Sequence, residues 1–261
     1  VAIGSLALDA NTTGSQLTAI GYQSLSANTT ASFNTGIGDH TLKLNTTGSQ
    51  NIAIGTNCLD ANTTGNYNVA VGVNSLTTNT TASNNTAVGT DASKLNETGS
   101  NNTAVGANTL DANTTADNNI AVGYSALGSN TTGNSNVAVG VNALDANTTG
   151  VQNNAVGYLS LATNTTGNNN QAFGRRALRL TTTGSNNNGF GEKALEANTT
   201  GSSNTALGHN ALLSNTTASN NVSVGANALA ANTTGTRNVA IGTDTLDAAI
   251  AINDNIAIGY Q

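Results

Sequence analysis

One stretch of seventeen residues decides the fold of this chain: residues 69–85 read Val-Ala-Val-Gly-Val-Asn-Ser-Leu-Thr-Thr-Asn-Thr-Thr-Ala-Ser-Asn-Asn. The same pattern fills all 261 residues without an insertion or a deletion. Its clearest marker is a glycine at every seventeenth position, from Gly4 to Gly259. A fixed internal period indicates a repeat architecture, in which each repeat is one structural unit that stacks on its neighbours.

Most positions of the repeat keep one residue type. The residue before the glycine is large and apolar, and the residue two before it is Ala except at Gly36, Gly189 and Ser223. Leu lies four residues after the glycine except at Ser93, and Asn lies four residues before each later glycine except at Leu17. Seventeen residues cannot hold a pair of helices, and Asn, Thr, Gly and Val are poor helix formers. The repeat therefore predicts strands and turns.

We expect an all-β fold, a parallel β-solenoid with one repeat per turn and about 15 turns spaced about 4.8 Å apart. The apolar run before each glycine predicts a strand of about four residues, and the Asn-Thr-Thr segment predicts a turn. A second short strand is expected at Ser24–Leu25 and its equivalents. Because the composition does not change along the chain, we expect a single domain over residues 1–261.

In such a solenoid each repeat position becomes a column of equivalent residues. We expect the Val/Ile column and the Leu column to fill the interior, and the Asn columns to form amide ladders between turns. The glycine column predicts a backbone conformation that a Cβ would prevent. The Ala column is expected on the opposite strand face from Val/Ile. We therefore expect chains to pack side by side through Ala, with a homotrimer as the first choice.

The composition excludes several protein classes. Hydrophobic residues make up 37% of the chain, with Ala the most frequent of them, aromatic residues make up 3% and charged residues 8%. That supply is too thin for the core of a conventional enzyme, and no run approaches the roughly 18 apolar residues of a membrane span. A net charge of −6 argues against binding a nucleic-acid backbone. The chain begins at Val1 without a visible signal peptide, so we expect it to be a segment of a longer protein.

The strand motif resembles the head repeats of trimeric autotransporter adhesins. It occurs as Val-Ala-Val-Gly at 69–72 and 137–140, and as Ile-Ala-Ile-Gly at 256–259. The Asn-Thr-Ala-Leu-Gly at 204–208 is also similar to repeats of phage tail fibres. This resemblance implies a left-handed parallel β-roll, three chains in a bundle, and a role in adhesion or as a fibre shaft. The adhesin repeat is typically shorter, and here the Asn-Thr-Thr-Gly segment lengthens each turn.

The Asn-Thr-Thr segments match the acceptor pattern for N-glycosylation. Good turn and ladder chemistry explains Asn and Thr equally well, so we weigh these positions as candidates only. A Thr pair also raises ice or glycan binding, but neighbouring strand residues face opposite ways, which leaves one hydroxyl column on any flat face. The candidate glycosylation sites are Asn11, Asn28, Asn45, Asn62, Asn79, Asn96, Asn113, Asn130, Asn147, Asn164, Asn198, Asn215 and Asn232.

Two further surface features are candidates for contact with a partner. The position after each glycine varies most and holds four of the five tyrosines. Basic residues cluster once, and one turn later Glu192 falls beside Arg175 and Glu196 beside Arg179, which predicts ion pairs between turns. The candidate contact residues are Tyr22, Tyr124, Tyr158, Tyr260, Arg175 and Arg176.

No combination of residues predicts catalysis or a bound cofactor or metal. His40 and His209 lie about ten turns apart, and the Asp residues of one column never occupy successive turns. Cys58 stands in a column of small residues, where we expect a packed thiol. We therefore expect a non-enzymatic structural segment of an extracellular fibre, the shaft or head of a surface adhesin, at the cell surface or in the extracellular space. The alternatives are a phage tail-fibre shaft on a virion and, less favoured, an ice- or glycan-binding solenoid.

Overall fold

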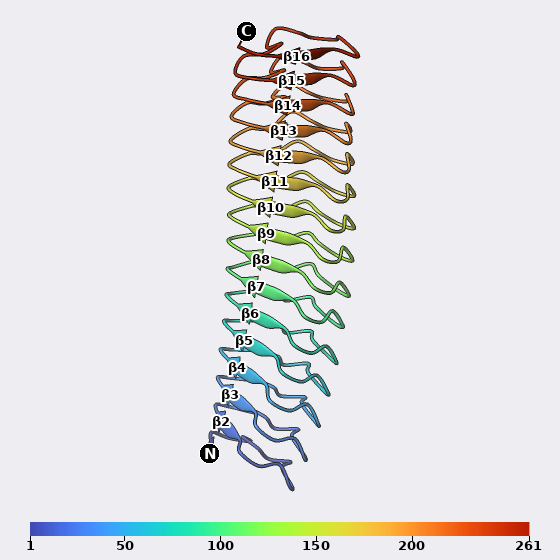
Figure 1. Cartoon of the computed structure of the whole chain (residues 1–261). Coiled ribbons are helices and arrows are strands. Elements are labelled where there is room, and N and C mark those ends of the chain that lie inside the picture. The colour runs from blue at the N-terminus through green and yellow to red at the C-terminus, as the bar shows by residue number, and fades with distance from the viewer. Residues whose placement is uncertain (261) are drawn as a thin grey trace. The chain divides into compact units, whose positions relative to one another are not determined.

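The computed structural model describes residues 1–260, which form two compact units, Val1–Thr132 and the part from Gly133 onward. Each unit is a parallel β-solenoid in which one 17-residue repeat makes one turn, so the predicted fold class is confirmed (Figure 1). The strands are β1 (Ala2–Ile3), β2 (Thr18–Ile20), β3 (Thr35–Ile37), β4 (Ile52–Ile54), β5 (Val69–Val71), β6 (Thr86–Val88), β7 (Thr103–Val105), β8 (Ile120–Val122), β9 (Val137–Val139), β10 (Asn154–Val156), β11 (Gln171–Phe173), β12 (Asn188–Phe190), β13 (Thr205–Leu207), β14 (Val222–Val224), β15 (Val239–Ile241) and β16 (Ile256–Ile258).

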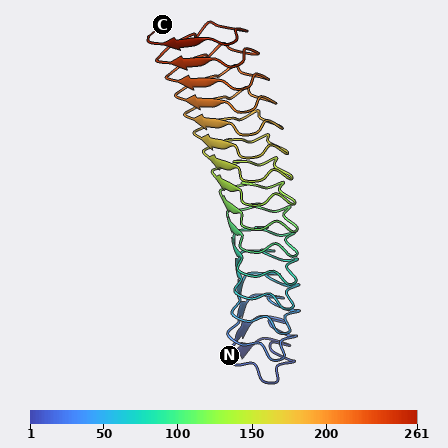
Figure 2. The same ribbon diagram turned by 45° about the vertical axis from the view of Figure 1, so that its right-hand side comes forward.

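Successive strands pair in parallel and in register within each unit. In the first unit Ala70 of β5 lies opposite Ala87 of β6, and in the second unit Ala155 of β10 lies opposite Ala172 of β11. Equivalent residues therefore lie directly above one another, as the constant period predicts. Figure 2 shows that the strands of each unit gather on one side, with the irregular turns opposite them.

The alanine at the centre of each strand points into the core, and the residues on either side point outward. Ala70 and Ala87 are fully buried, whereas Ile54 and Val88 are 39% and 36% exposed. We expected the Val/Ile column inside and the Ala column outside, and that prediction is wrong. The interior between the sheet and the Leu column is too narrow: a Cβ built at Gly189, in the Ala column, would lie 3.3 Å from Cγ of Leu178. The column opposite Leu therefore holds only small side chains, Ala, Gly and Ser223.

The Leu column forms the other wall of the core, but in turns and not in strands. Leu25 and Leu76 are fully buried and have φ values of 53° and 51°. The expected second strand at Ser24–Leu25 is therefore absent, because a left-handed residue cannot continue a strand. This conformation costs a non-glycine residue about 1–2 kcal/mol, and burial of the Leu side chain offsets it with about 1.5–3 kcal/mol. The turns still bond to one another: the Leu25 amide donates to the Thr41 carbonyl at 2.9 Å.

Two columns of buried asparagine complete the core, as the amide-ladder prediction requires. In the first column, the side-chain amide of Asn62 donates to Oδ1 of Asn45 at 2.7 Å and to the carbonyl of Gly65 at 3.1 Å. In the second column, Oδ1 of Asn68 accepts from the backbone N–H of Asn85 at 3.0 Å. These amides satisfy backbone groups that would otherwise be buried without a partner, and this is why the two columns tolerate so little change.

Candidate surface sites

The column that follows the glycines is solvent-facing, as predicted. The tyrosines at Tyr22, Tyr124, Tyr158 and Tyr260 are 47%, 54%, 50% and 72% exposed. Tyr22 and Tyr124 lie six turns apart in the first unit, and Tyr158 and Tyr260 lie six turns apart in the second, so the two tyrosines of a unit do not meet. The ring of Tyr22 meets that of His40 edge-on at 5.3 Å. Each tyrosine is thus a separate exposed contact point.

The predicted basic cluster exists and is tied together by ion pairs between turns. Arg175 donates to Glu192, and Nε of Arg179 donates to Glu196 at 2.9 Å, as the repeat register predicts. Arg176 also reaches Glu196, with Nη2 2.5 Å from the carboxylate. The hydrogen bond from Arg175 lowers the pKa of Glu192 and raises that of Arg175, so both groups stay charged over a wide pH range. With Lys193, four basic residues face two acidic ones.

An aromatic pair lies next to this cluster and was not recognised from the sequence as a surface feature. Phe173 and Phe190 stack with ring centroids 5.0 Å apart and planes 3° from parallel. Phe190 belongs to the column expected in the interior; instead it is 37% exposed on the outer face of the sheet, as is Phe173. The reason is the reversal of the strand faces described above. The signal in the sequence was the change from Val/Ile to Phe in two successive turns.

The candidate glycosylation sites lie in the first asparagine column. Asn28 and its equivalents are fully or almost fully buried, while Asn11 is half-buried. Every one of the thirteen side-chain nitrogens donates a hydrogen bond, as Asn28 does to Oδ1 of Asn11 at 3.0 Å and to the carbonyl of Ala31 at 3.1 Å. A glycan on such a nitrogen would have to enter the core and break the ladder. We therefore propose that the folded solenoid carries none at these positions.

The two residues after each of these asparagines, which are both Thr except at Glu97, have different roles. The first hydroxyl bonds to the backbone of the next turn: Oγ1 of Thr63 donates to the carbonyl of Thr80 at 3.0 Å. The second threonine, such as Thr64, is exposed. A single regular hydroxyl column therefore faces solvent on this side. An ice-binding face would therefore have one column of exposed hydroxyls, and not the two columns that a repeated Thr-Thr pair suggests.

Few ionisable groups lie inside the solenoid. The Cys58 thiol is fully buried and donates to the carbonyl of Ile54 at 3.3 Å, and burial raises its pKa. Over residues 1–260, three or more His, Cys, Asp or Glu side chains never come together in a way that could hold a metal ion. The same residues enclose no ligand-sized cavity. Whatever these units bind is therefore expected on their outer faces.

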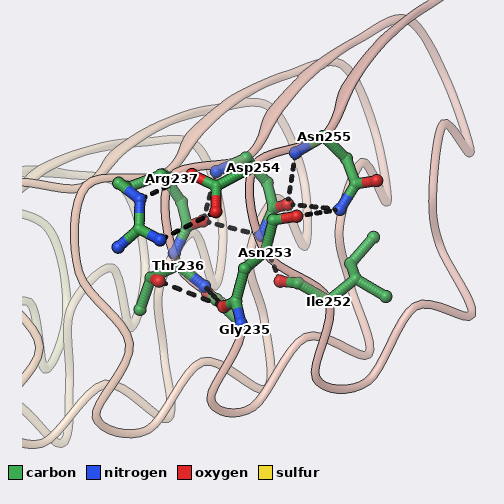
Figure 3. A network of polar contacts seen from close by, with 9 residues as sticks. Gly235, Thr236, Arg237, Ile252, Asn253, Asp254 and Asn255 are labelled. Atoms are coloured by element: carbon green, nitrogen blue, oxygen red, sulfur yellow. Dashed lines mark hydrogen bonds and ion pairs between the residues drawn. The ribbon is translucent and has the colours of Figure 1, made fainter.

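Ion pairs that span one repeat recur near the end of the second unit. Arg237 donates to both carboxylate oxygens of Asp254 in the next turn, at 2.6 and 2.8 Å (Figure 3). Beside them, Oδ1 of Asn253 accepts from the backbone N–H of Thr236 at 2.7 Å. Asp254 follows Arg237 by 17 residues, the same separation as in the Arg175 and Arg179 pairs. These contacts fix neighbouring turns in register.

The pKa values of Asp145 and Asp254 are shifted in opposite directions, by burial and by hydrogen bonds from Arg237 respectively, which gives a test by pH. Burial of Asp145 raises its pKa above 3.8, so the folded chain holds that proton more tightly than the unfolded chain does. The stability gained from the protonated form is present at low pH and is lost as the pH rises through the folded pKa. We therefore expect Asp145→Asn to raise the free energy of unfolding at pH 7 by less than about 1 kcal/mol, because the group is half exposed. Urea unfolding should show no such gain below the unfolded pKa.

Asp254→Asn is the matched control for this pH effect. The hydrogen bonds from Arg237 lower the pKa of Asp254, so its contribution is present above the unfolded pKa and is lost as the pH falls. This variant should lose stability at pH 7 and match the parent protein at low pH. Equal pH profiles for the two variants would contradict the assignment.

The sequence matches neither a protein-family model nor a curated protein. None of the described residues belongs to a helix that is long and apolar enough to cross a bilayer. The resemblance to adhesin and tail-fibre repeats thus rests on the motifs in the sequence.

Proposed function

We propose that this chain is a structural segment of an extracellular fibre, the shaft or head of a surface adhesin, and that it associates with two further copies of itself. The observation that carries the proposal is the outward Val/Ile column. It repeats in every turn of both units while the interior is filled by Ala, Leu and Asn. The motif resemblance supports a location at the cell surface, and a phage tail-fibre shaft is the alternative.

The exposed column is apolar, whereas the solvent-facing positions of a monomeric protein are usually polar. Ile37, Val105 and Ile241 are each between 37% and 38% exposed, and Leu207 is 50% exposed. Strand residues one and three face the same way, and the first position adds Ile52 at 40% exposure. Continuous apolar stripes of this kind mark surfaces that become covered.

The area of the stripe suits association. Eight strands spaced about 4.8 Å apart and three residues wide give each unit about 350 Å² of flat face. The two units together offer about 700 Å², close to the roughly 800 Å² that one partner contributes to a standard protein interface. Covering this face with other copies would remove the apolar column from water without changing the fold. The packing of chains through Ala that the sequence predicted cannot occur, because the Ala side chains are buried in the core of the solenoid.

Sedimentation velocity tests the proposal directly. The parent chain should sediment with three times the 25.8 kDa mass of one chain. The double variant Val71→Thr with Val88→Thr keeps the β-branched shape and the strand, but it should raise the dissociation constant at least about tenfold because it removes apolar contact. Circular dichroism should remain that of the parent.

A matched control uses the same substitution outside the stripe. Val73 and Val141 follow glycines and are 46% and 43% exposed. Val73→Thr with Val141→Thr should leave association within about twofold of the parent, since these side chains lie outside the strand face. A parent chain that stays monomeric at all concentrations tested would contradict the proposal. An equal effect of both double variants would assign the contact to another face.

A further inference from the structure

The turns of β10, β11 and β12 depart from the repeat in several columns at once. The first strand position, which is Thr, Val or Ile in every other full strand, holds amides there, at Asn154, Gln171 and Asn188. The third position changes to Phe in β11 and β12, at Phe173 and Phe190. In a chain that repeats so strictly, a change confined to one place is not required by the fold, because the other turns fold without it.

The two positions after the glycine change in the same turns. The column that holds Asn57, Asn74 and their equivalents forms an amide ladder, with Asn57 donating to Oδ1 of Asn74 at 3.1 Å. In the turns of β11 and β12 this column holds Arg176 and Lys193, which carry positive charge in place of an amide. The preceding column holds Arg175 there. We define the Phe-Arg patch as Gln171, Phe173, Phe190, Arg175, Arg176 and Lys193.

The charge of this region is opposite to that of the chain. The four basic side chains Arg175, Arg176, Arg179 and Lys193 face Glu192 and Glu196, which leaves a net charge of +2 on a chain whose net charge is −6. Arg175 is half exposed and presents further donors to solvent. A local positive surface on an acidic protein favours an anionic partner, and guanidinium groups bind carboxylate and sulfate in two-point contacts.

The uncharged groups favour a ligand that is rich in hydroxyls. The side-chain amide of Asn154 donates to Oε1 of Gln171 at 2.6 Å. Neither the Gln171 amide nitrogen nor the Asn188 side chain makes a hydrogen bond to another described residue. Phe173 and Phe190 stack on each other, which covers one face of each ring, and the ring edges carry positive partial charge. Amide N–H groups, ring edges and guanidinium groups all carry positive charge or partial charge, so together they would attract the oxygen atoms of a ligand.

We propose that the Phe-Arg patch is a binding site for an acidic polysaccharide, a sugar polymer that bears carboxylate or sulfate groups. Hydroxyl groups of the polymer would form hydrogen bonds with the amides of Gln171 and its neighbours at the first strand position. Its acidic groups would form ion pairs with Arg175, Arg176 and Lys193. Because strands lie about 4.8 Å apart, the three turns offer an extended row of such contacts and suit a linear polymer. The inference does not rest on the fibre function: Gln171, Phe173 and Phe190 lie on the strand face that association would cover, so the polymer and a further copy of the chain would compete for these three turns.

The test measures binding of dextran sulfate, polygalacturonate and neutral dextran of equal length by calorimetry or biolayer interferometry. The parent chain should bind the two acidic polymers, should not bind neutral dextran, and should lose affinity as salt rises from about 50 mM to about 500 mM. Arg176→Asn with Lys193→Asn restores the amide of this column, so the chain should fold. This double variant should bind the acidic polymers at least about tenfold more weakly.

Two further double variants make the result specific. Lys43→Ser with Lys94→Ser removes the same charge from the first unit and should change binding less than about twofold. Phe173→Val with Phe190→Val restores the common residue of the column without changing charge, and should weaken binding about threefold or more.

Several outcomes would overturn the proposal. They are no binding of either acidic polymer, equal binding of neutral dextran, and an equal loss in the lysine control. If the Arg176→Asn and Lys193→Asn changes instead altered the sedimenting mass and left polymer binding intact, the patch would be a contact between copies. An unchanged mass together with lost polymer binding would support the site independently of the proposed fibre.

Discussion

Replacing Gly72 with alanine is expected to destabilise the first unit by about 3–5 kcal/mol. Gly72 has a φ of 135°, in a region that side chains other than glycine rarely adopt. A Cβ at this position would lie 2.4 Å from the carbonyl oxygen of Gly89 in the next turn. The backbone of one turn must therefore move away from the next. Urea unfolding followed by circular dichroism, together with limited proteolysis, would measure the loss.

The same substitution at Gly128 is the control. Gly128 lies in a turn column where other repeats carry Asp60, Lys94 or Asp111, so a side chain is accommodated there. Gly128→Ala should leave stability within about 0.5 kcal/mol of the parent. Because turns contact only their neighbours, cleavage in the Gly72 variant should begin close to residue 72. Equal stability of the two variants would show that the close backbone approach at Gly72 is not needed.

Replacing Asn187 with alanine is expected to cost about 2–5 kcal/mol. Its side-chain nitrogen donates to the carbonyl of Gly201 at 2.9 Å, and its Oδ1 accepts from the backbone N–H of Asn204 at 3.1 Å. Alanine leaves both backbone groups buried without a partner, and each costs about 1–3 kcal/mol. Urea unfolding of the variant measures the sum.

The next residue supplies the matched control. Asn188 is the first residue of β12, faces outward and makes no side-chain hydrogen bond to another described residue. Asn188→Ala should therefore change stability by less than about 0.5 kcal/mol. If the two alanine variants unfolded alike, the buried amide column would not be what holds the turns together.

Much of the fold could be predicted from the sequence because the period is constant. The spacing of Gly72 and Gly89 fixed the length of a turn, and that spacing places Arg175 beside Glu192 and Asn45 beside Asn62. These are relations between turns, and a constant period alone predicts them. The exposed tyrosines followed in the same way, because the most variable column is expected to face solvent.

The direction of the strand faces could not be predicted in the same way. Alternation states that Ala70 and Val71 point to opposite sides, but it does not say which side is the core. Hydrophobicity favoured Val inside, and the structure places Ala inside because the buried Leu76 of the same turn leaves room for a small side chain only. The Phe-Arg patch was missed for this reason, since Phe173 and Phe190 were assigned to the wrong face.

The sequence by itself determined the repeat, the parallel stacking, the amide ladders and the pairing of charges, since each depends only on which residues recur every 17 positions. The tertiary structure decided what lies inside a turn. The left-handed Leu residues bring the turn wall close to the sheet, and their side chains and the asparagine amides take up the space in between. That distance depends on the path of the backbone around one turn, which periodicity does not specify.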